Sequence, residues 1–372
     1  MTYTEARTGR PIDVDTPPMA EQIRPFTVHE GLAIYRFGAG QPLLLVPYPH
    51  AWNLVGTPNF TALVDGLTQL GRTVVTFDPP GAGRSTRPMR LDMPEMLECA
   101  EEALATCGVD VPVDVVGHSM GSYAALAFAV EQPARVRRLV LAGVGAGGRS
   151  YMQAPGALWN ASHPQFRRWA LFAALYWLSR RRAPEKLMSN IVTRASYFDP
   201  ARAPQQAVEL RDWLRPARPR TRWGNVARKL DYRPRLGEIR VPTLLLVGRR
   251  DPQMPPACAE ELAQGIPHAQ LVVFDHSGHY PFVEEPEPFW AAAGAFLARA
   301  TQGAFSLHAE FPVQPGVPGL GHHLRPPGLE CGRGCDRDGE ARDLTPGAPS
   351  AAGLRVCQII IVSDAAARGE MV

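Results

Sequence analysis

The stretch VDVVGHSMGSYAALAFAVEQ, residues 113–132, decides the fold of this chain. Its valine-rich start predicts a strand, and the alanine-rich run that begins at residue 122 predicts a helix. Between them stands G-x-S-x-G, and a sharp strand-to-helix turn there needs glycines on both sides so that neighbouring backbone can pass. A chance match in a glycine-rich chain is the alternative, which the flanking strand and helix disfavour. Ser119 is therefore expected at the strand's carboxyl end, with the Met120 N–H beside it to stabilise an oxyanion.

Short apolar runs alternate with helix-compatible stretches on both sides of this turn. The predicted strands are residues 43–46, 73–77, 113–116, 139–141, 243–247 and 270–274. The predicted helices are residues 60–70, 93–107, 120–131, 257–265 and 288–299. This alternation is typical of an α/β fold with a mostly parallel sheet and helices on both faces.

Composition divides the chain into four parts. Residues 147–232 lack a strand pattern, are rich in aromatic residues and hold 16 Lys and Arg against 5 Asp and Glu, which predicts a helical cap inserted before the last two strands. Residues 26–146 and 233–300 then form the core, and residues 1–25 an N-terminal extension. Residues 301–372 contain 18 Gly and Pro, and we expect most of this tail to be disordered.

Overall composition limits the function classes. With 45% hydrophobic and 20% charged residues, the chain of 372 residues is in the globular range. A net charge of +3 is too small to indicate nucleic acid as a partner. The longest apolar run, residues 169–178, is half of the roughly 20 residues that a membrane span needs, and residues 1–15 show no secretory signal. We expect a cytoplasmic protein without stable membrane association, whose oligomeric state stays open, with reduced thiols at Cys99, Cys107, Cys258, Cys331, Cys335 and Cys357.

A serine nucleophile needs a base, and the base needs an orienting carboxylate. Both residue types follow predicted strands: Asp251 stands in GRRDP after residues 243–247, and His279 stands in DHSGH after residues 270–274. Because the carboxyl ends of parallel strands share one edge of a sheet, these side chains are candidates to meet Ser119.

Residues 26–300 resemble the α/β-hydrolase family. The resemblance rests on FDPPGAGRS at 77–85, GHSMG at 117–121 and HSGHYPFVEEP at 276–286, and the motifs are most similar to the proline iminopeptidase-like branch with its related esterases and amidases. It implies the order nucleophile, acid, base, hence Ser119, Asp251 and His279. The family pattern puts the base after Ser-Gly, which favours His279 over His276. The family's other position for the acid, in AGVGAGG, holds no carboxylate.

The same resemblance implies a second oxyanion donor, the residue after a His-Gly pair. This chain reads VPYPHAW at 46–52. If His50 and Ala51 stand for that pair, the donor is the Trp52 N–H, which we prefer. If Pro47 takes the His position, the donor would be Pro49, which has no N–H.

The expected activity is a cofactor-free serine hydrolase that cleaves an ester or amide of a small, largely apolar molecule. Haloalkane dehalogenases and epoxide hydrolases of this family use an aspartate where this chain has Ser119, which disfavours their reactions. Substrate-pocket candidates are His50, Trp169, Phe172, Tyr176 and Trp177. The apolar helix at 166–182 is expected to be buried or to line the pocket.

Three alternatives remain. In a proline iminopeptidase-like enzyme, Glu209 and Asp212 would hold a substrate's amine. A ligand-binding, receptor-like protein would retain the triad with vestigial turnover. A third alternative retains the triad for a non-hydrolytic reaction, such as lyase or acyl-transfer chemistry. A zinc site at His322, His323, Cys331 and Cys335 is disfavoured by the three-residue gap between the cysteines, so no metal is expected.

Overall fold

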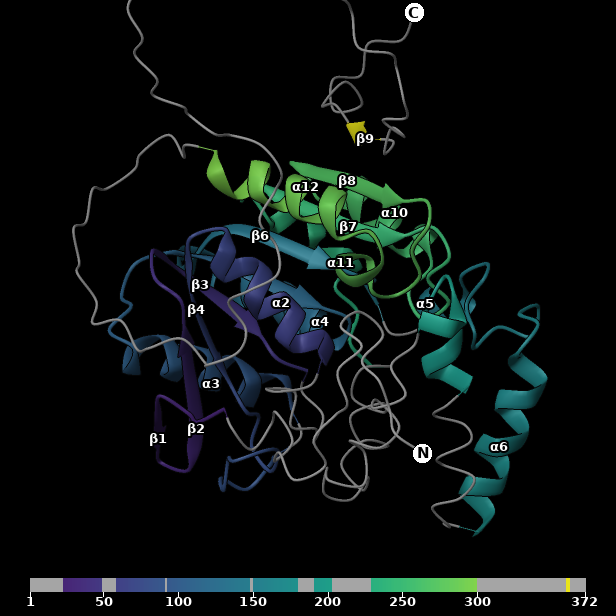
Figure 1. Cartoon of the computed structure of the whole chain (residues 1–372), viewed down its shortest axis with the longest axis horizontal. Helices are drawn as coiled ribbons and strands as arrows, with labels where there is room; N and C mark the ends of the chain where they lie inside the picture. The colour runs from purple at the N-terminus through teal and green to yellow at the C-terminus, as the bar shows by residue number, and fades with distance from the viewer. Residues whose placement is uncertain are drawn as a thin grey trace, which may run out of the picture. The chain divides into compact units, whose positions relative to one another are not determined.

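The structure is a computed structural model that describes residues 23–48, 58–90, 92–147, 150–179, 191–202, 229–299 and 359–361 (Figure 1). In these residues nine strands form one sheet, in the order β1-β2-β4-β3-β5-β6-β7-β8-β9. The strands are β1 (Thr27–His29), β2 (Leu32–Phe37), β3 (Gln41–Val46), β4 (Arg72–Phe77), β5 (Val113–His118), β6 (Val136–Ala142), β7 (Thr243–Gly248), β8 (Ala269–Phe274) and β9 (Ile359–Ile361).

The centre of the sheet is parallel. Strands β4, β3, β5, β6, β7 and β8 pair in parallel, whereas β2 pairs antiparallel with β4, and β9 pairs antiparallel with β8. Parallel strands need crossover connections, and helices supply them. The carboxyl ends of β5, β6, β7 and β8 therefore lie along one edge, where the candidate residues follow the strands.

The helices are α2 (Pro58–Gln69), α3 (Met93–Thr106), α4 (Met120–Glu131), α5 (Ser150–Gln153), α6 (Phe166–Ser179), α10 (Pro256–Gly265), α11 (Pro281–Glu284) and α12 (Pro286–Ala298). Short 3-10 turns occupy Pro133–Arg135, Pro200–Arg202 and Arg233–Glu238. A side-chain cap fixes the start of α3, where the Asp92 carboxylate accepts the Glu95 N–H at 2.8 Å.

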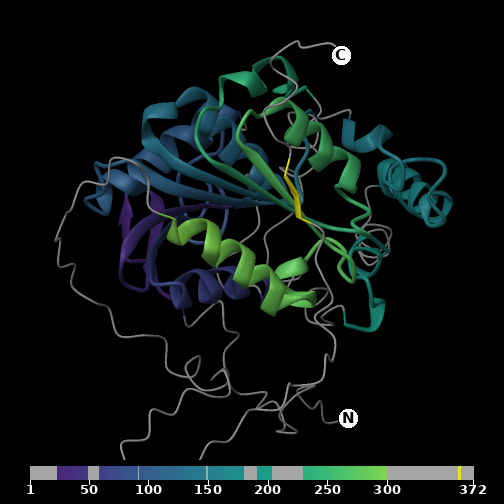
Figure 2. The same cartoon turned by 90° about the horizontal axis from the view of Figure 1, so that it is seen from above.

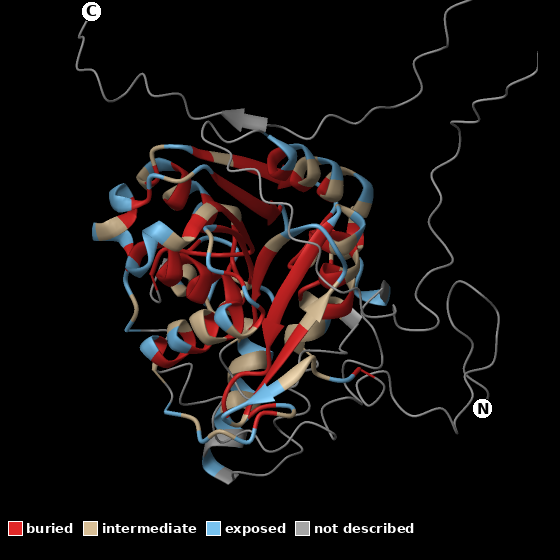
Figure 3. Ribbon diagram, turned by 90° about the vertical axis from the view of Figure 1, so that its left-hand side faces the viewer, coloured by how far each residue is buried: buried red, intermediate tan, exposed pale blue. Residues whose placement is uncertain are grey.

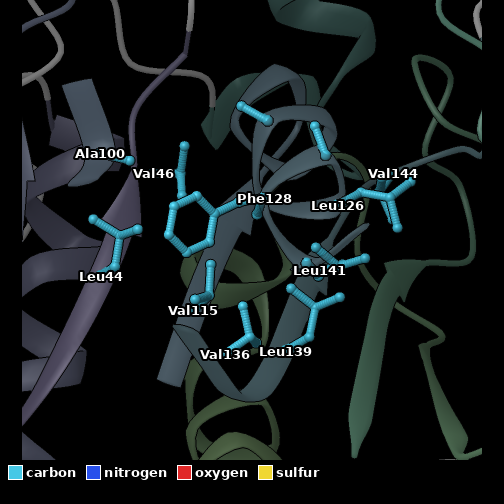
Figure 4. Close-up of a cluster of buried hydrophobic side chains, with 14 of the residues drawn as sticks. Leu44, Val46, Ala100, Val115, Leu126, Phe128, Val136, Leu139, Leu141 and Val144 are labelled. Atoms are coloured by element: carbon cyan, nitrogen blue, oxygen red, sulfur yellow. The ribbon is translucent and has the colours of Figure 1, made fainter. Parts of the chain in front are cut away.

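Two apolar clusters sandwich the sheet. One joins alternate strand residues to α3, α4 and α10, and Figure 4 shows its centre around Phe128, Val115 and Leu141. The other joins the opposite strand face to α2, α11 and α12, and Figure 2 shows α2 and α12 on one side of the sheet. Figure 3 shows the central strands buried almost throughout. Burial on both faces explains why these strands read as continuous apolar runs.

The six strands and five helices that the sequence predicts are confirmed, with ends that differ by three residues or fewer. The sequence did not predict the hairpin of β1 and β2. Nor did it predict β9, which is the only segment of residues 301–372 that the structure describes. Between β6 and β7, where the cap was expected, the described residues form α5, α6 and a short helical segment at 191–195.

Candidate active site

Ser119 occupies the turn between β5 and α4. Its φ is +53°, and Glu30 is the only other non-glycine residue with a positive φ in the described part of the chain. A Cβ at Gly117 would lie 2.6 Å from the Gly121 carbonyl oxygen, and one at Gly121 would lie 2.4 Å from the Val46 carbonyl oxygen. Only glycine fits at both positions, so the motif is required by the close approach of three backbone segments.

Hydrogen bonds hold this turn against the end of β6. The Ser119 N–H donates to the Ala142 carbonyl at 2.9 Å, and the Ser122 hydroxyl donates to the same oxygen at 3.0 Å. Met120 is the first residue of α4, and N–H groups in a first turn have no partner within the helix. The Met120 N–H and the positive end of the helix dipole are therefore available to a developing negative charge.

Asp251 and His279 form a buried pair, 3% and 1% exposed. Asp251 Oδ1 accepts the N–H groups of Gln253 at 2.8 Å and Met254 at 2.9 Å, and Oδ2 lies 2.7 Å from His279 Nδ1. Because a carboxylate accepts, Nδ1–H donates to it, and in the neutral ring His279 Nε2 has the lone pair that a general base needs.

Gly143 brings this pair beside Ser119. The residue follows Ala142 with a φ of +56°, and a Cβ there would lie 3.1 Å from His279 Cε1 and 3.3 Å from Asp251 Oδ2. The structure thus brings Asp251 and His279 into contact next to the strand end that holds Ser119. Among the described residues no hydrogen bond joins the Ser119 hydroxyl to the His279 ring. Such catalytic hydrogen bonds often tighten only when substrate binds.

His118, the residue before the candidate nucleophile, also contacts His279. Its ring is 1% exposed and lies 4.7 Å from the His279 ring, centroid to centroid. Nε2 lies 2.8 Å from the His279 carbonyl oxygen, and Nδ1 contacts the Tyr48 hydroxyl. Burial, and then the nearby His279, lowers the pKa of His118 well below its usual value, so the ring is neutral. Since a carbonyl only accepts, Nε2–H donates to it and the Tyr48 hydroxyl donates to Nδ1.

His276, the other histidine of the DHSGH motif, and Asp275, the acid of that motif, lie elsewhere. His276 is exposed, and its ring packs edge-on against Phe198 at 5.4 Å. Asp275 pairs with Arg249 at 2.9 Å on the surface. Neither side chain takes part in the buried pair.

Part of the expected pocket is described. Trp169 is half-buried and packs edge-on against Trp159 at a centroid distance of 5.0 Å, and Phe172 is half-buried. His50 and Trp52 lie outside the described residues, as do the side chains of Tyr176 and Trp177, the carboxylates Glu209 and Asp212, and the four tail residues considered for zinc.

The apolar helix α6 differs from the expectation of a buried helix. Leu171, Leu175 and Leu178 are 56%, 41% and 73% exposed. They recur at helical spacing, so one face of α6 is open to solvent.

The described residues contain no helix that is both long and apolar enough to cross a membrane. They also contain no cluster of three or more His, Cys, Asp or Glu side chains placed to bind a metal ion.

Known proteins share this architecture. The sequence profile of the alpha/beta hydrolase fold matches residues 45–286. A 2-hydroxy-6-oxononadienedioate/2-hydroxy-6-oxononatrienedioate hydrolase from Klebsiella pneumoniae is 28% identical over 80% of this chain and 98% of its own length. A hydrolase of the same name from Cupriavidus pinatubonensis is 30% identical over 71% of this chain and 91% of its own length.

Solved structures agree on the fold. An esterase from Exiguobacterium antarcticum has a TM-score of 0.59 at 21% identity and covers 74% of this chain and 100% of its own. The enol-lactonase from Burkholderia xenovorans has a TM-score of 0.56 at 20% identity, with coverage of 74% and 100%. With the profile match and the relatives' near-complete coverage, the chain belongs to the α/β-hydrolase family and is a hydrolase.

Proposed function

We propose that this hydrolase acts through an acyl-serine intermediate on a small molecule, with Ser119 as nucleophile, His279 as general base and Asp251 as the orienting acid. The observation that carries the proposal is the buried 2.7 Å contact between His279 and Asp251, next to the strand end that holds Ser119. Each residue stands at the end of a different strand, in the chain order that this fold uses.

The chemistry balances without a cofactor. His279 Nε2 accepts the hydroxyl proton as Ser119 Oγ bonds to the substrate's carbonyl carbon. The Met120 N–H, and by family resemblance the Trp52 N–H, stabilise the oxyanion. Collapse breaks the bond to the leaving group, which takes the proton from His279. A water molecule then attacks the acyl-serine and gives a proton to His279. Collapse breaks the bond to Ser119 Oγ, which takes that proton back from His279 as the acid is released.

Esters and amides are the substrates that this chemistry fits most simply, but the relatives favour a second candidate. Their substrate, 2-hydroxy-6-oxononadienedioate, has neither an ester nor an amide, so its hydrolysis breaks a carbon–carbon bond beside the 6-oxo group. The same attack by Ser119 on a ketone would begin that reaction. Residues 147–232 hold 16 Lys and Arg against 5 Asp and Glu, and this positive balance would attract a dicarboxylate.

Four further assignments belong to this proposal. Residues 147–232 form the cap over a core of residues 26–146 and 233–300, and the tail is dispensable for chemistry. The enzyme works in the cytoplasm, where thiols stay reduced, in keeping with the free thiols of Cys99, Cys107 and Cys258. A small molecule, and neither nucleic acid nor membrane, is its partner.

The test compares the full chain with Ser119→Ala on four substrates: p-nitrophenyl acetate, p-nitrophenyl butyrate, proline p-nitroanilide and 2-hydroxy-6-oxononadienedioate. Hydrolysis of the last substrate is measured as the loss of its dienolate absorbance. Turnover of any of these by the full chain that disappears in Ser119→Ala supports the proposal, and the substrate that is turned over selects among ester, amide, aminopeptidase and carbon–carbon chemistry. Undiminished turnover in Ser119→Ala contradicts the assigned nucleophile. Labelling by a fluorophosphonate without turnover of any substrate favours the receptor-like alternative.

A further inference from the structure

A segment of the expected cap is bonded directly to the backbone of the candidate base. The His279 N–H donates to the Ser196 carbonyl at 2.6 Å, and the two residues are 1% and 0% exposed. Gly278 approaches the same residue so closely that a Cβ on it would lie 2.3 Å from the Ser196 carbonyl oxygen. The loop before the base and this segment therefore fit together with no space for a larger residue.

One carboxylate joins the two segments a second time. Glu284, at the end of α11, is 7% exposed. Its Oε1 accepts the Phe198 N–H at 2.7 Å, and its Oε2 accepts the Gly278 N–H at 2.7 Å. Charge-assisted bonds of this length are about twice as strong as neutral ones, so the side chain is a firm link between residue 198 and the loop of His279.

The same segment reaches the loop of the candidate acid. The Ser196 hydroxyl accepts a hydrogen bond from Gln253 Nε2 at 2.8 Å and donates to the Val192 carbonyl at 2.5 Å. The backbone N–H of Gln253 in turn donates to Asp251 Oδ1. One short stretch of chain thus contacts both loops that supply the buried pair.

We propose that residues 196–198 and Glu284 form a clasp through which the cap sets the position of the catalytic base, with Glu284 as a positioning residue. This inference rests on the proposed role of His279. A part of the substrate that packs against the cap then affects the position of Ser196, whose carbonyl accepts the His279 N–H. Binding energy from groups far from the reacting carbonyl is converted into alignment of the base.

The variant that tests the clasp is Glu284→Gln. An amide of the same shape has one accepting oxygen, so one of the two N–H groups faces an NH₂ group instead of an acceptor. Glu287→Gln is the matched control, because Glu287 is an exposed carboxylate in the first turn of α12 and has no part in the clasp. If Glu284→Gln does not fold, Gln253→Ala replaces it as the test variant. It removes the hydrogen bond from Gln253 Nε2 to the Ser196 hydroxyl and so separates residue 196 from the loop of Asp251.

Two measurements separate positioning from simple destabilisation. Titration of Ser119 with a fluorophosphonate counts the competent sites, and kcat on p-nitrophenyl butyrate is divided by that count. We expect kcat per site to fall by about 10- to 100-fold in Glu284→Gln, with KM nearly unchanged, and the Glu287→Gln values to equal those of the parent chain. An unchanged kcat per site, even with fewer competent sites, overturns the proposal.

Amide hydrogen exchange supplies the second readout and does not depend on turnover. Peptides that cover residues 191–202 and 275–285 are expected to lose protection together in Glu284→Gln and to keep it in Glu287→Gln. Unchanged protection of both peptides overturns the clasp. If the parent chain turns over no substrate, the proposed function fails, and the exchange result alone still decides whether the clasp exists.

Discussion

The His118 ring holds the backbone of His279: its Nε2–H donates to the His279 carbonyl at 2.8 Å. On the other side, the His279 N–H donates to Ser196. The candidate base is thus fixed at both of its backbone polar groups, by the residue that precedes the candidate nucleophile and by the expected cap. Tyr48 extends this contact to the end of β3, next to the segment expected to supply the second oxyanion donor.

We predict that His118→Leu destabilises the protein and lowers turnover. A leucine takes the Nε2–H donor away from the buried His279 carbonyl, at a cost of about 1–3 kcal/mol for a group left unsatisfied. Urea unfolding measures the stability, and ester hydrolysis below the unfolding transition measures the activity. Tyr48→Phe removes the hydrogen bond to the far side of the His118 ring and leaves the His279 carbonyl bonded, so it is expected to have the smaller effect on kcat. Equal kcat values for His118→Leu and the parent chain would contradict the positioning role.

A substitution at Gly143 tests how tightly the Asp251 and His279 pair is packed. In Gly143→Ala the new Cβ would lie 3.1 Å from His279 Cε1, and the residue keeps its positive φ of +56°. Gly108→Ala is the matched control, because Gly108 has a φ of +71° and no atom within 4 Å of an added Cβ. Both variants carry a strain of about 1 kcal/mol. Only Gly143→Ala is expected to lower kcat/KM, by roughly tenfold or more. Equal activity in the two variants would show that the pair tolerates displacement.

The parallel core was predictable because its strands are buried on both faces, so runs such as LLLV at 43–46 and TLLLV at 243–247 are apolar without interruption. The outer strands were harder. Strand β1 has three residues with none buried, and β9 is a three-residue pairing far along the chain from β8. Strand β1 has no pattern that local sequence can reveal. The isoleucines of β9 form an apolar run, but local sequence does not reveal that this run pairs with β8.

The sequence also predicted the segments that carry the candidate site, because nucleophile, acid and base each follow a strand in a short motif. Their catalytic roles stay predictions. The residues that hold the base were missed for physical reasons. Ser196 acts through its backbone carbonyl, which any residue has, and Glu284 binds two backbone N–H groups. His118 gave one signal, a polar ring at the end of a buried strand, which could have been followed.

The pH dependence of the free energy of unfolding should show the protonation of the Asp78 carboxylate. This carboxylate is fully buried, and its Oδ2 accepts hydrogen bonds from the Tyr35 hydroxyl and the Arg84 N–H. Its Oδ1 has no hydrogen-bond partner among the residues that the structure describes. Burial raises the pKa of Asp78 from 3.8 to about 6. The folded protein therefore holds the proton more tightly than the unfolded chain. Its contribution to stability is complete below pH 3.8 and is lost as the pH rises through 6.

The matching variant is Asp78→Asn, which imitates the protonated form and keeps both hydrogen bonds to one oxygen. We expect it to exceed the parent chain in stability by an amount that grows between pH 4 and pH 6 and levels off at roughly 3 kcal/mol, the equivalent of two pKa units. Urea titrations of both proteins at each pH measure this difference. A difference that stays constant from pH 4.5 to pH 8 would refute the assignment.

Asp114 should be the most sensitive ionic site in the described residues. It is fully buried at the start of β5, the opposite end of the strand from Ser119. Arg137 donates to both of its oxygens, at 2.8 and 2.7 Å, while Arg138 and Arg72 lie 3.2 and 3.3 Å away. In Asp114→Asn three guanidinium groups lose their common anion, and the predicted loss is about 3–5 kcal/mol.

The surface pair of Glu238 and Arg235 supplies the control, since exposed ion pairs contribute little. Thermal unfolding of Asp114→Asn and Glu238→Gln gives the comparison. Activity at a temperature where both variants are folded should be unchanged, because neither residue contacts the candidate site. A Tm for Asp114→Asn equal to that of Glu238→Gln would show that the arginines find other partners.

Three cysteines should resist alkylation until the protein unfolds. Cys99, Cys107 and Cys258 are 1%, 5% and 1% exposed, and burial raises their pKa to about 12, 11 and 12. At pH 8 a thiol with a pKa of 12 is a thiolate in about one molecule in 10,000, and the thiolate is the species that iodoacetamide attacks. Mass spectrometry of peptides labelled across a urea series is expected to show these three thiols reacting together at the unfolding midpoint. Rapid labelling of Cys258 alone in the native protein would mean that α10, which follows the loop of Asp251, opens without global unfolding, and the acid of the candidate site would then be less firmly held than its hydrogen bonds indicate.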